Sequence, residues 1–222
     1  MNKFKGLLFD LDGVIVDTAK YHYLAWKSLT RDLGIDFTQE DNERLKGVSR
    51  LASLEIILEI GKLKMSQEEK ERNCTKKNNL YVTYIEKLTK DDILPGVRAL
   101  LEDSRNKGYK IALGSASKNS SLILNCLELT ELFDVIIDGN KVSKAKPDPE
   151  VFVRGAERLG LDVGLDVSDC IVFEDAIAGI RAAHNGGMKA VGLGNKEILI
   201  EADIVIEGFK DTRIEDIITQ LN

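Results

Sequence analysis

Short apolar runs alternate with segments of helical periodicity along most of the chain. The runs cover residues 4–9, 110–113, 133–137, 170–173, 189–191 and 204–206. Short runs between polar turns are typical of buried strands. The segments between the later runs predict helices, and two of these helices are expected to end at Gly108 and Gly160. This alternation predicts an α/β fold, a Rossmann-like parallel sheet with helices on both faces.

Residues 17–90 show a different pattern, with apolar positions at helical spacing only. We expect one helix over residues 18–33, a second over residues 50–60 capped by Ser49, and a third that runs from a capping box at Ser66 to about Leu88. We therefore predict two domains. Residues 1–16 and 91–222 form the Rossmann-like core, and residues 17–90 form a small all-helical cap inserted after the first strand.

The composition and charge limit which classes of partner and which cellular compartment we expect for the protein. The 222 residues carry a net charge of −6, which argues against nucleic acid or an anionic membrane as a partner. Three widely spaced cysteines, Cys74, Cys126 and Cys170, fit reduced thiols better than a disulfide framework. Asp10 interrupts the first apolar run, so no signal peptide is expected, and no later run suits a transmembrane helix. We expect a cytoplasmic monomer that acts on small molecules.

Two aspartates follow the first predicted strand. Asp10 and Asp12 are separated by a single residue, and Gly13 comes next. Side chains of an extended chain alternate with a period of two, so both carboxylates leave the backbone on the same side. Two carboxylates at the end of a buried strand are costly unless a ligand compensates them, and a hard cation such as Mg²⁺ suits them. An acidic turn that merely ends the strand is the alternative for this motif taken alone.

Polar residues also follow three later strands. Ser115 follows the second strand, Lys146 lies in the loop after the third, and Glu174 and Asp175 follow the fourth. Each has a simpler interpretation: Ser115 as a helix cap, Lys146 as a surface cation, and the acids as favourable charges at a helix N-terminus. Ligands of such sheets bind at the carboxyl ends of the strands, so the clusters together predict one site.

The combination suits transfer of a phosphoryl group to Asp10. Mg²⁺ held by Asp10, Asp175 and the backbone at Asp12 would reduce the repulsion between the carboxylate and the phosphoryl group. Lys146 and the Ser115 hydroxyl would hold phosphoryl oxygens. Asp12 would protonate the leaving oxygen and then deprotonate the next acceptor.

The helical insert contributes further candidates. His22 and Trp26 lie one turn apart on the helix that leaves the aspartate motif. The loop Lys46-Gly47-Val48-Ser49-Arg50 places two cations beside a helix N-terminus, a position that favours phosphate. A surface histidine, a core tryptophan and a solvated basic turn are the alternatives, and the pattern leaves them open.

The four core clusters resemble the motifs of the haloacid dehalogenase superfamily. Asp10-Leu11-Asp12-Gly13, the strand end at Ser115, Lys146-Pro147 and Glu174-Asp175 follow one another in the order of those motifs. The resemblance covers the whole chain and implies that residues 17–90 are the cap domain of that superfamily. Asp12 resembles the phosphotransferase branch, because the dehalogenases lack this second acid.

Within the superfamily, the cap and the second motif resemble the β-phosphoglucomutase family. The matching segments are Thr18-x-x-x-His22-x-x-x-Trp26, residues 46–50 with Ser53, and residues 115–119. The resemblance implies an isomerase that interconverts β-D-glucose 1-phosphate and glucose 6-phosphate. The reaction would pass through an aspartyl-phosphate enzyme and β-glucose 1,6-bisphosphate, which is also the priming phosphoryl donor.

The same resemblance implies roles for individual residues. Asp10 would be the nucleophile and Asp12 the acid and base, with Ser115 and Lys146 completing the catalytic set. One Mg²⁺ per active site would be held by Asp10, Asp12, Glu174 and Asp175. The sugar phosphate would be bound by residues of both domains: His22, Trp26, Lys46, Gly47, Val48, Ser49, Arg50, Ser53, Lys77, Ala116, Ser117, Lys118 and Asn119.

Two other functions stay open. A sugar-phosphate or phosphoglycolate-type phosphatase would share every core residue. A non-catalytic relative would be expected to lack Asp10 or Lys146, and both are present. A mutase, unlike a phosphatase, needs a second phosphate site, because its bisphosphate must turn over and rebind. Arg50 and residues 117–119 are the candidates for that site.

Overall fold

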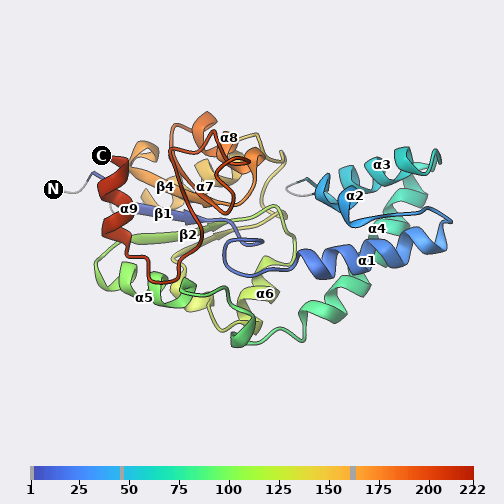
Figure 1. Ribbon diagram of the computed structural model, residues 1–222, viewed down its shortest axis with the longest axis horizontal. Helices are drawn as coiled ribbons and strands as arrows, with labels where there is room; N and C mark the ends of the chain where they lie inside the picture. Colours follow the sequence, from blue (N-terminus) through green and yellow to red (C-terminus); the bar gives the residue numbers. More distant parts are fainter. Residues whose placement is uncertain (1–2, 46–47, 161–163) are drawn as a thin grey trace.

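The structure is a computed structural model that describes residues 3–45, 48–160 and 164–222. Figure 1 shows two parts side by side, a sheet between layers of helices and a group of helices beyond one end of it. The strands are β1 (Gly6–Phe9), β2 (Lys110–Gly114), β3 (Val135–Ile137), β4 (Cys170–Glu174), β5 (Lys189–Leu193) and β6 (Ile204–Ile206). The α-helices are α1 (Ala19–Asp32), α2 (Gln39–Glu43), α3 (Arg50–Ile60), α4 (Gln67–Ile85), α5 (Val97–Asn106), α6 (Ser120–Cys126), α7 (Glu150–Gly160), α8 (Ile177–Asn185) and α9 (Ile214–Leu221).

In the described part of the chain, the strands form one parallel sheet in the order β3-β2-β1-β4-β5-β6. This confirms the predicted α/β class. Phe9 is in register with Leu113 on one side and Phe173 on the other. The residues that follow these three therefore leave the sheet at one edge. From β1 the chain adds β2 and β3 on one side and then β4, β5 and β6 on the other, so the strand order reverses between β1 and β4. Sheets of this kind bind ligands at such a switch point.

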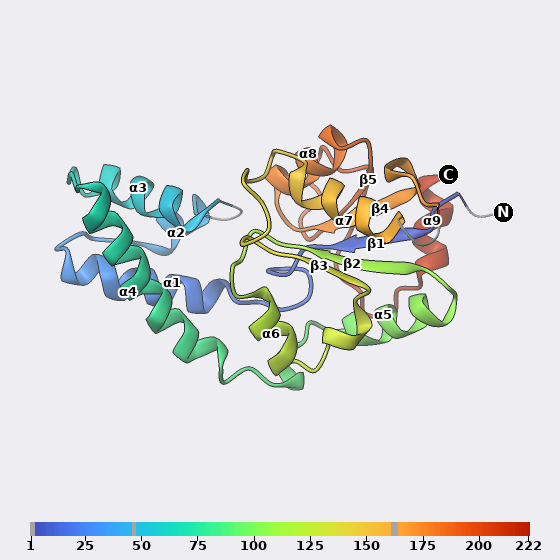
Figure 2. The ribbon, with the colours of Figure 1, turned by 180° about the vertical axis from the view of Figure 1, so that it is seen from behind.

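Alternate residues of the strands pack on opposite faces of the sheet. Leu7 and Phe9 belong to one apolar cluster with residues of α5, α6 and α9, whereas Leu8 belongs to another with α7 and α8. Figure 2 shows these two helical layers above and below the strands. Both faces are covered, which explains why the strands read as continuous apolar runs rather than alternating ones.

Helices α1 to α4 lie together beyond the carboxyl edge of the sheet (Figure 1). They enclose an apolar cluster of their own, which includes Trp26, Phe37, Leu54 and Ile57. The two segments that join them to the sheet pair with each other, because the amide of Leu94 donates to the carbonyl of Ile15 over 3.0 Å. These features favour the predicted cap at residues 17–90, whose limits stay a proposal.

Several element ends differ from the predictions. The helix that begins at Ser66 with its capping box ends at Ile85 rather than near Leu88. The short helix α2 was not predicted, because five residues are too few to show a period; it begins with a capping box between Thr38 and Asp41. None of the helices described is long and apolar enough to cross a membrane.

Candidate active site

A cavity of about 920 Å³ lies between the carboxyl edge of the sheet and the helices α1, α3 and α4. Its lining includes residues of both parts of the molecule. The predicted residues that border it are Asp10, Asp12, His22, Trp26, Val48, Ser49, Arg50, Ser53, Lys77, Ser115, Ala116, Ser117, Lys118, Asn119, Lys146, Glu174 and Asp175. The two remaining candidates, Lys46 and Gly47, lie outside the described residues.

Three carboxylates gather at the ends of β1 and β4. Oxygens of Asp10, Glu174 and Asp175 all lie within 4.8 Å of one another. Gly13 permits this approach: its φ is +79°, and a Cβ at this position would lie 2.1 Å from an Asp175 carboxylate oxygen. Closely spaced carboxylate oxygens are the donors that Mg²⁺ prefers, so this donor set fits a hard divalent cation. The carboxylate of Asp12 is not part of this group, and its predicted main-chain role toward the metal stays a prediction.

Lys146 connects two of these carboxylates. Its ammonium lies 2.6 Å from an Asp10 oxygen and 2.7 Å from a Glu174 oxygen, in a buried position. Burial alone would lower the pKa of Lys146, but the two carboxylates outweigh it and raise that pKa, so the side chain stays charged. The ammonium also lies over the aromatic ring of Phe152, 4.5 Å from its centroid. A fixed positive charge therefore lies beside the predicted nucleophile.

Asp12 is held apart from this ion pair. Thr18, at the start of α1, directs its hydroxyl to the Asp12 carboxylate rather than to the backbone of its own helix. Burial, followed by the negative charge of Asp10, raises the pKa of Asp12 to about 7. A carboxyl group with a pKa near neutral pH can both give and take a proton, which is what an acid–base catalyst requires.

The loop after β2 is organised by its own hydroxyl groups. The Ser115 hydroxyl accepts a hydrogen bond from the amide of Ser117 over 3.1 Å, which leaves its hydrogen available to donate. The Ser117 hydroxyl in turn accepts from the amide of Asn119 over 3.2 Å. The loop thus presents small donors to the cavity, as the resemblance predicts for phosphate binding.

The wall formed by α1 and α4 contains a buried lysine. Lys77 lies 2.9 Å from Nδ1 of His22 and sits over the rings of Trp26 and Tyr81. Burial, and then the charge of Arg50, lowers the pKa of Lys77 to about 7. Burial and Lys77 also lower the pKa of His22, so the imidazole is neutral at pH 7. His22 is thus partly buried in this wall, and Trp26 lies both in the apolar cluster of the helical part and at the cavity.

One hydrogen bond joins the two parts directly at the site. The Asn119 side-chain amide donates to the side-chain oxygen of Asn78 on α4 over 3.0 Å. Arg50, at the start of α3, borders the same cavity and is partly buried, which lowers its pKa. Asn78 and Tyr81 were missed by the sequence analysis. Tyr81 lies four residues after Lys77 and so on the same face of the helix, a spacing that could have identified it, whereas Asn78 is adjacent to Lys77 and had no such signal.

The comparisons with known proteins agree with this geometry. The family model of the haloacid dehalogenase-like hydrolases matches residues 4–187. The β-phosphoglucomutase of Bacillus subtilis is 43% identical over 215 residues, which span 95% of this chain and 92% of that protein. A phosphorylated carbohydrates phosphatase of Thermotoga maritima is 30% identical over 90% of this chain and 92% of its own length.

A solved structure is similar along nearly the whole chain. The crystal structure of β-phosphoglucomutase from Clostridium difficile superposes with a TM-score of 0.93 at 44% identity, and the match covers 99% of this chain and 97% of that one. The similarity therefore includes the helices α1 to α4 as well as the sheet.

Proposed function

Because the chain belongs to the haloacid dehalogenase-like hydrolase family, we propose that it is a phosphoryl-transfer isomerase that interconverts β-D-glucose 1-phosphate and glucose 6-phosphate. One observation carries the proposal. A single cavity contains Asp10, the candidate nucleophile, beside the Lys146 ammonium, and it is also lined by hydrogen-bond donors from both parts of the molecule. The 43% identity to a β-phosphoglucomutase, over both parts, supports this substrate.

Asp10, Glu174, Asp175 and the backbone at Asp12 would hold one Mg²⁺, consistent with the spacing of the three carboxylates. When bound, the cation supplies charge neutralisation for two anions that must approach each other. Lys146 contributes a further positive charge on the side of Asp10, within hydrogen-bond distance of its carboxylate.

The first half-reaction transfers a phosphoryl group from β-glucose 1,6-bisphosphate to the enzyme. A carboxylate oxygen of Asp10 forms the bond to phosphorus, and the bond from phosphorus to the sugar oxygen breaks. Asp12 gives its proton to that leaving oxygen. Lys146 and the Ser115 hydroxyl hold the oxygens of the transferring group, where charge redistributes.

The second half-reaction reverses these roles on a sugar monophosphate. Asp12, now a carboxylate, takes the proton of the sugar hydroxyl as its oxygen attacks the phosphorus on Asp10. The Asp10–phosphorus bond breaks and the bisphosphate re-forms. Because the bisphosphate must bind in two orientations, the cavity needs a site for the phosphate that is not transferred. Arg50, Ser117, Lys118 and Asn119 form that distal site in our proposal.

The helical part has a second task, which is to keep water from the aspartyl phosphate. Trp26, Tyr81 and the apolar stem of Lys77 are buried in its wall. A cavity closed by these groups favours a sugar hydroxyl over water as the acceptor. Without that exclusion the same core residues would produce a phosphatase.

One assay tests the proposal. The protein is incubated with Mg²⁺, β-glucose 1-phosphate and a trace of β-glucose 1,6-bisphosphate, and glucose 6-phosphate and inorganic phosphate are both measured. We expect glucose 6-phosphate without matching inorganic phosphate, and no turnover by Asp10→Asn. Stoichiometric phosphate with free glucose would instead identify a sugar-phosphate phosphatase, the function suggested by the Thermotoga maritima relative at 30% identity.

A further inference from the structure

We propose that Asp138, Gly139 and Asn140, the residues that follow β3, position the distal phosphate segment, residues 117–119, of the loop after β2. These three residues are absent from the catalytic and binding sets considered above. The inference rests on the proposed function, because residues 117–119 are assigned there to the phosphate that is not transferred, whereas Ser115 holds the transferring group. We call Asp138, Gly139 and Asn140 the buttress.

The buttress holds the loop by its carbonyl groups. The amide of Gly139 donates to the Ser117 carbonyl over 3.1 Å. The side-chain amide of Asn140 donates to the Lys118 carbonyl over 3.0 Å. The buttress therefore holds the carbonyl groups of two successive loop residues, Ser117 and Lys118.

Asp138 fixes the buttress itself. Its carboxylate is buried, with 5% exposed surface, and accepts from the Asn140 backbone amide over 3.0 Å. Its other oxygen lies 3.3 Å from the Asn140 side-chain nitrogen. This second contact turns the nitrogen of the Asn140 side-chain amide toward the Asp138 carboxylate. The same orientation lets that nitrogen donate to the Lys118 carbonyl.

Gly139 sets the distance between the buttress and the loop. A Cβ at this position would lie 2.2 Å from the carbonyl oxygen of Ala116 and 3.0 Å from its carbonyl carbon. The φ of Gly139 is outside the left-handed region, so an added methyl group would act through its contacts with the loop, which also include the Lys118 Cγ at 3.2 Å. The loop can lie where it does because no side chain is present here.

The consequence for the site follows from peptide geometry. In a trans peptide group the carbonyl and the next amide hydrogen point in opposite directions. With the Ser117 carbonyl turned to the buttress, the Lys118 amide hydrogen points away from it, and Lys118 borders the cavity. The buttress therefore aims a main-chain donor at the distal phosphate and holds the backbone that carries Ser117 and Asn119.

The test compares substrates with and without a second phosphate. β-Glucose 1,6-bisphosphate occupies the transfer site and the distal phosphate site, whereas p-nitrophenyl phosphate has one phosphate and occupies the transfer site alone. In Gly139→Ala we expect kcat/KM for the bisphosphate to fall by about 10- to 100-fold, since a displaced loop misplaces its donors. Hydrolysis of p-nitrophenyl phosphate should stay within about twofold.

Asn140 provides a second variant that does not crowd the structure. Asn140→Asp keeps the shape but replaces the donor with an acceptor facing the Lys118 carbonyl and the Asp138 carboxylate. We expect kcat/KM for the bisphosphate to fall by about three- to tenfold, equivalent to one lost hydrogen bond. Asn106→Ala, an exposed asparagine at the end of α5, is the control and should change neither activity.

Equal losses on both substrates, or no loss on either, would overturn the inference. If Gly139→Ala does not fold by circular dichroism, Asn140→Asp decides. A wild-type protein that hydrolyses the bisphosphate but does not isomerise β-glucose 1-phosphate would contradict the proposed function. The KM of the bisphosphate in the buttress variants would still test the positioning role in that case.

Discussion

The chemistry at the scale of single residues depends on two carboxylates two positions apart in different surroundings. Asp10 lies against Lys146, whereas Asp12 is partly buried, accepts from Thr18 and has a pKa raised to about 7. A shared strand end places both side chains on one side, and their neighbours then give them different tasks. One attacks and the other moves protons.

Replacing Asp12 tests this division. Asp12→Asn should lower kcat for isomerisation by about 10²- to 10⁴-fold, because no group remains to protonate the leaving oxygen. Asp17→Asn, the exposed acid at the start of α1, is the matched control and should keep nearly full activity. Steady-state kinetics with glucose 6-phosphate detection measures both, and an active Asp12→Asn variant would exclude the proton-transfer role.

Lys77 predicts a dependence of stability on pH. Its pKa is lowered from 10.5 to about 7, chiefly by burial and then by Arg50, while Asp12 and Cys74 oppose the shift. The unfolded chain therefore binds more protons than the folded one between pH 7 and about 10.5, so the folded state gains stability as pH rises through this range. Below pH 7 Lys77 is charged in the folded state as well, so the full free-energy cost of burying its ammonium opposes folding.

Lys77→Met should remove this cost. We expect the variant to be more stable than the wild type at pH 6, and the difference to shrink by about 2–3 kcal/mol between pH 6 and 9, since one pKa unit corresponds to about 1.4 kcal/mol. Urea unfolding without sugar phosphate at both pH values measures it. Lys76→Met, next to Lys77 but exposed and paired with Asp32, should show no such change with pH. A constant difference for Lys77→Met would show that the lysine does not titrate in this range.

At the scale of elements, loops between strands and helices determine where the catalytic groups lie. Glu150 at the start of α7 illustrates this. One of its carboxylate oxygens accepts from the amide of Ser143 (2.8 Å), the hydroxyl of Ser143 (3.0 Å) and the amide of Lys144 (2.8 Å). The first turn of the helix thereby clamps the loop that carries Lys146 to the carboxylates of Asp10 and Glu174.

Releasing this clamp should impair catalysis more than binding. In Glu150→Ala we expect kcat to fall by about tenfold with a smaller change in KM, because Lys146 acts on the transferring group and loses its support. Glu157→Ala, exposed on the same helix, serves as the control. Equal kinetics in the two variants would show that the loop holds Lys146 without Glu150.

Most elements were predictable from the sequence, for physical reasons. The buried strands are continuous apolar runs, and the capping residues Ser49 and Ser66 mark helix starts that the structure confirms. The short helix α2 was missed because it is too short to show a period. Thr18 is the N-cap residue of α1, but its hydroxyl donates to the Asp12 carboxylate and does not cap the helix, a contact between segments that no local pattern reveals.

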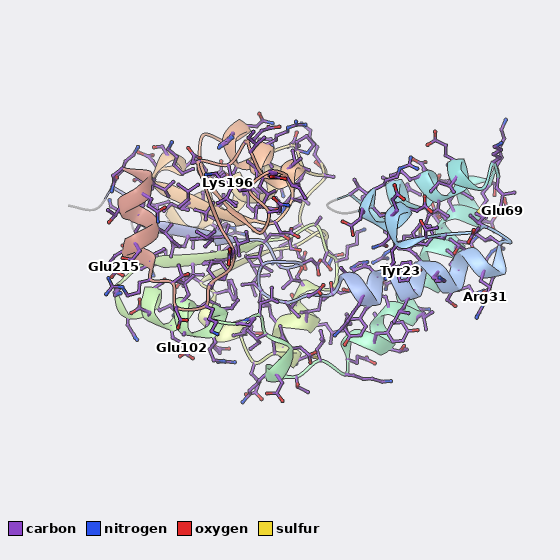
Figure 3. All side chains as sticks on the ribbon, in the orientation of Figure 1. Tyr23, Arg31, Glu69, Glu102, Lys196 and Glu215 are labelled. Carbon is purple, nitrogen blue, oxygen red and sulfur yellow. The ribbon has the colours of Figure 1, made fainter. Side chains whose placement is uncertain are left out.

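At the scale of the whole molecule, the site exists only where the two parts meet. The sheet contributes the nucleophile and the acids, and the helices α1, α3 and α4 contribute His22, Arg50 and Lys77. Side chains of both parts are drawn in Figure 3, where Arg31 and Glu69 lie at the far end of the helical part and Glu215 at the opposite end of the molecule. The C-terminus also lies at that opposite end, away from the helical part.

Arg50 tests the contribution of the helical part to the choice of acceptor. Arg50→Ala should lower the rate of isomerisation by about 10- to 100-fold and raise the ratio of inorganic phosphate to glucose 6-phosphate, because the distal phosphate is held less well and water gains access. Arg31→Ala, on the surface of the same part, is the control (Figure 3). Full isomerase activity in Arg50→Ala would remove Arg50 from the distal site.

The sequence by itself determined the succession of strands and most helices along the chain, because these depend on local periodicity. It also determined the four polar clusters at strand ends, because ligands of parallel sheets bind at the carboxyl ends of the strands. The tertiary structure decided what no local pattern contains. It placed Thr18 on Asp12, buried Lys77 against His22, joined Asn78 to Asn119, and set Asp138, Gly139 and Asn140 behind the loop at residues 115–119. Each of these contacts joins residues of different segments. Burial and neighbouring charges then shift the pKa values of Asp12, His22 and Lys77, and both arise only when the chain has folded.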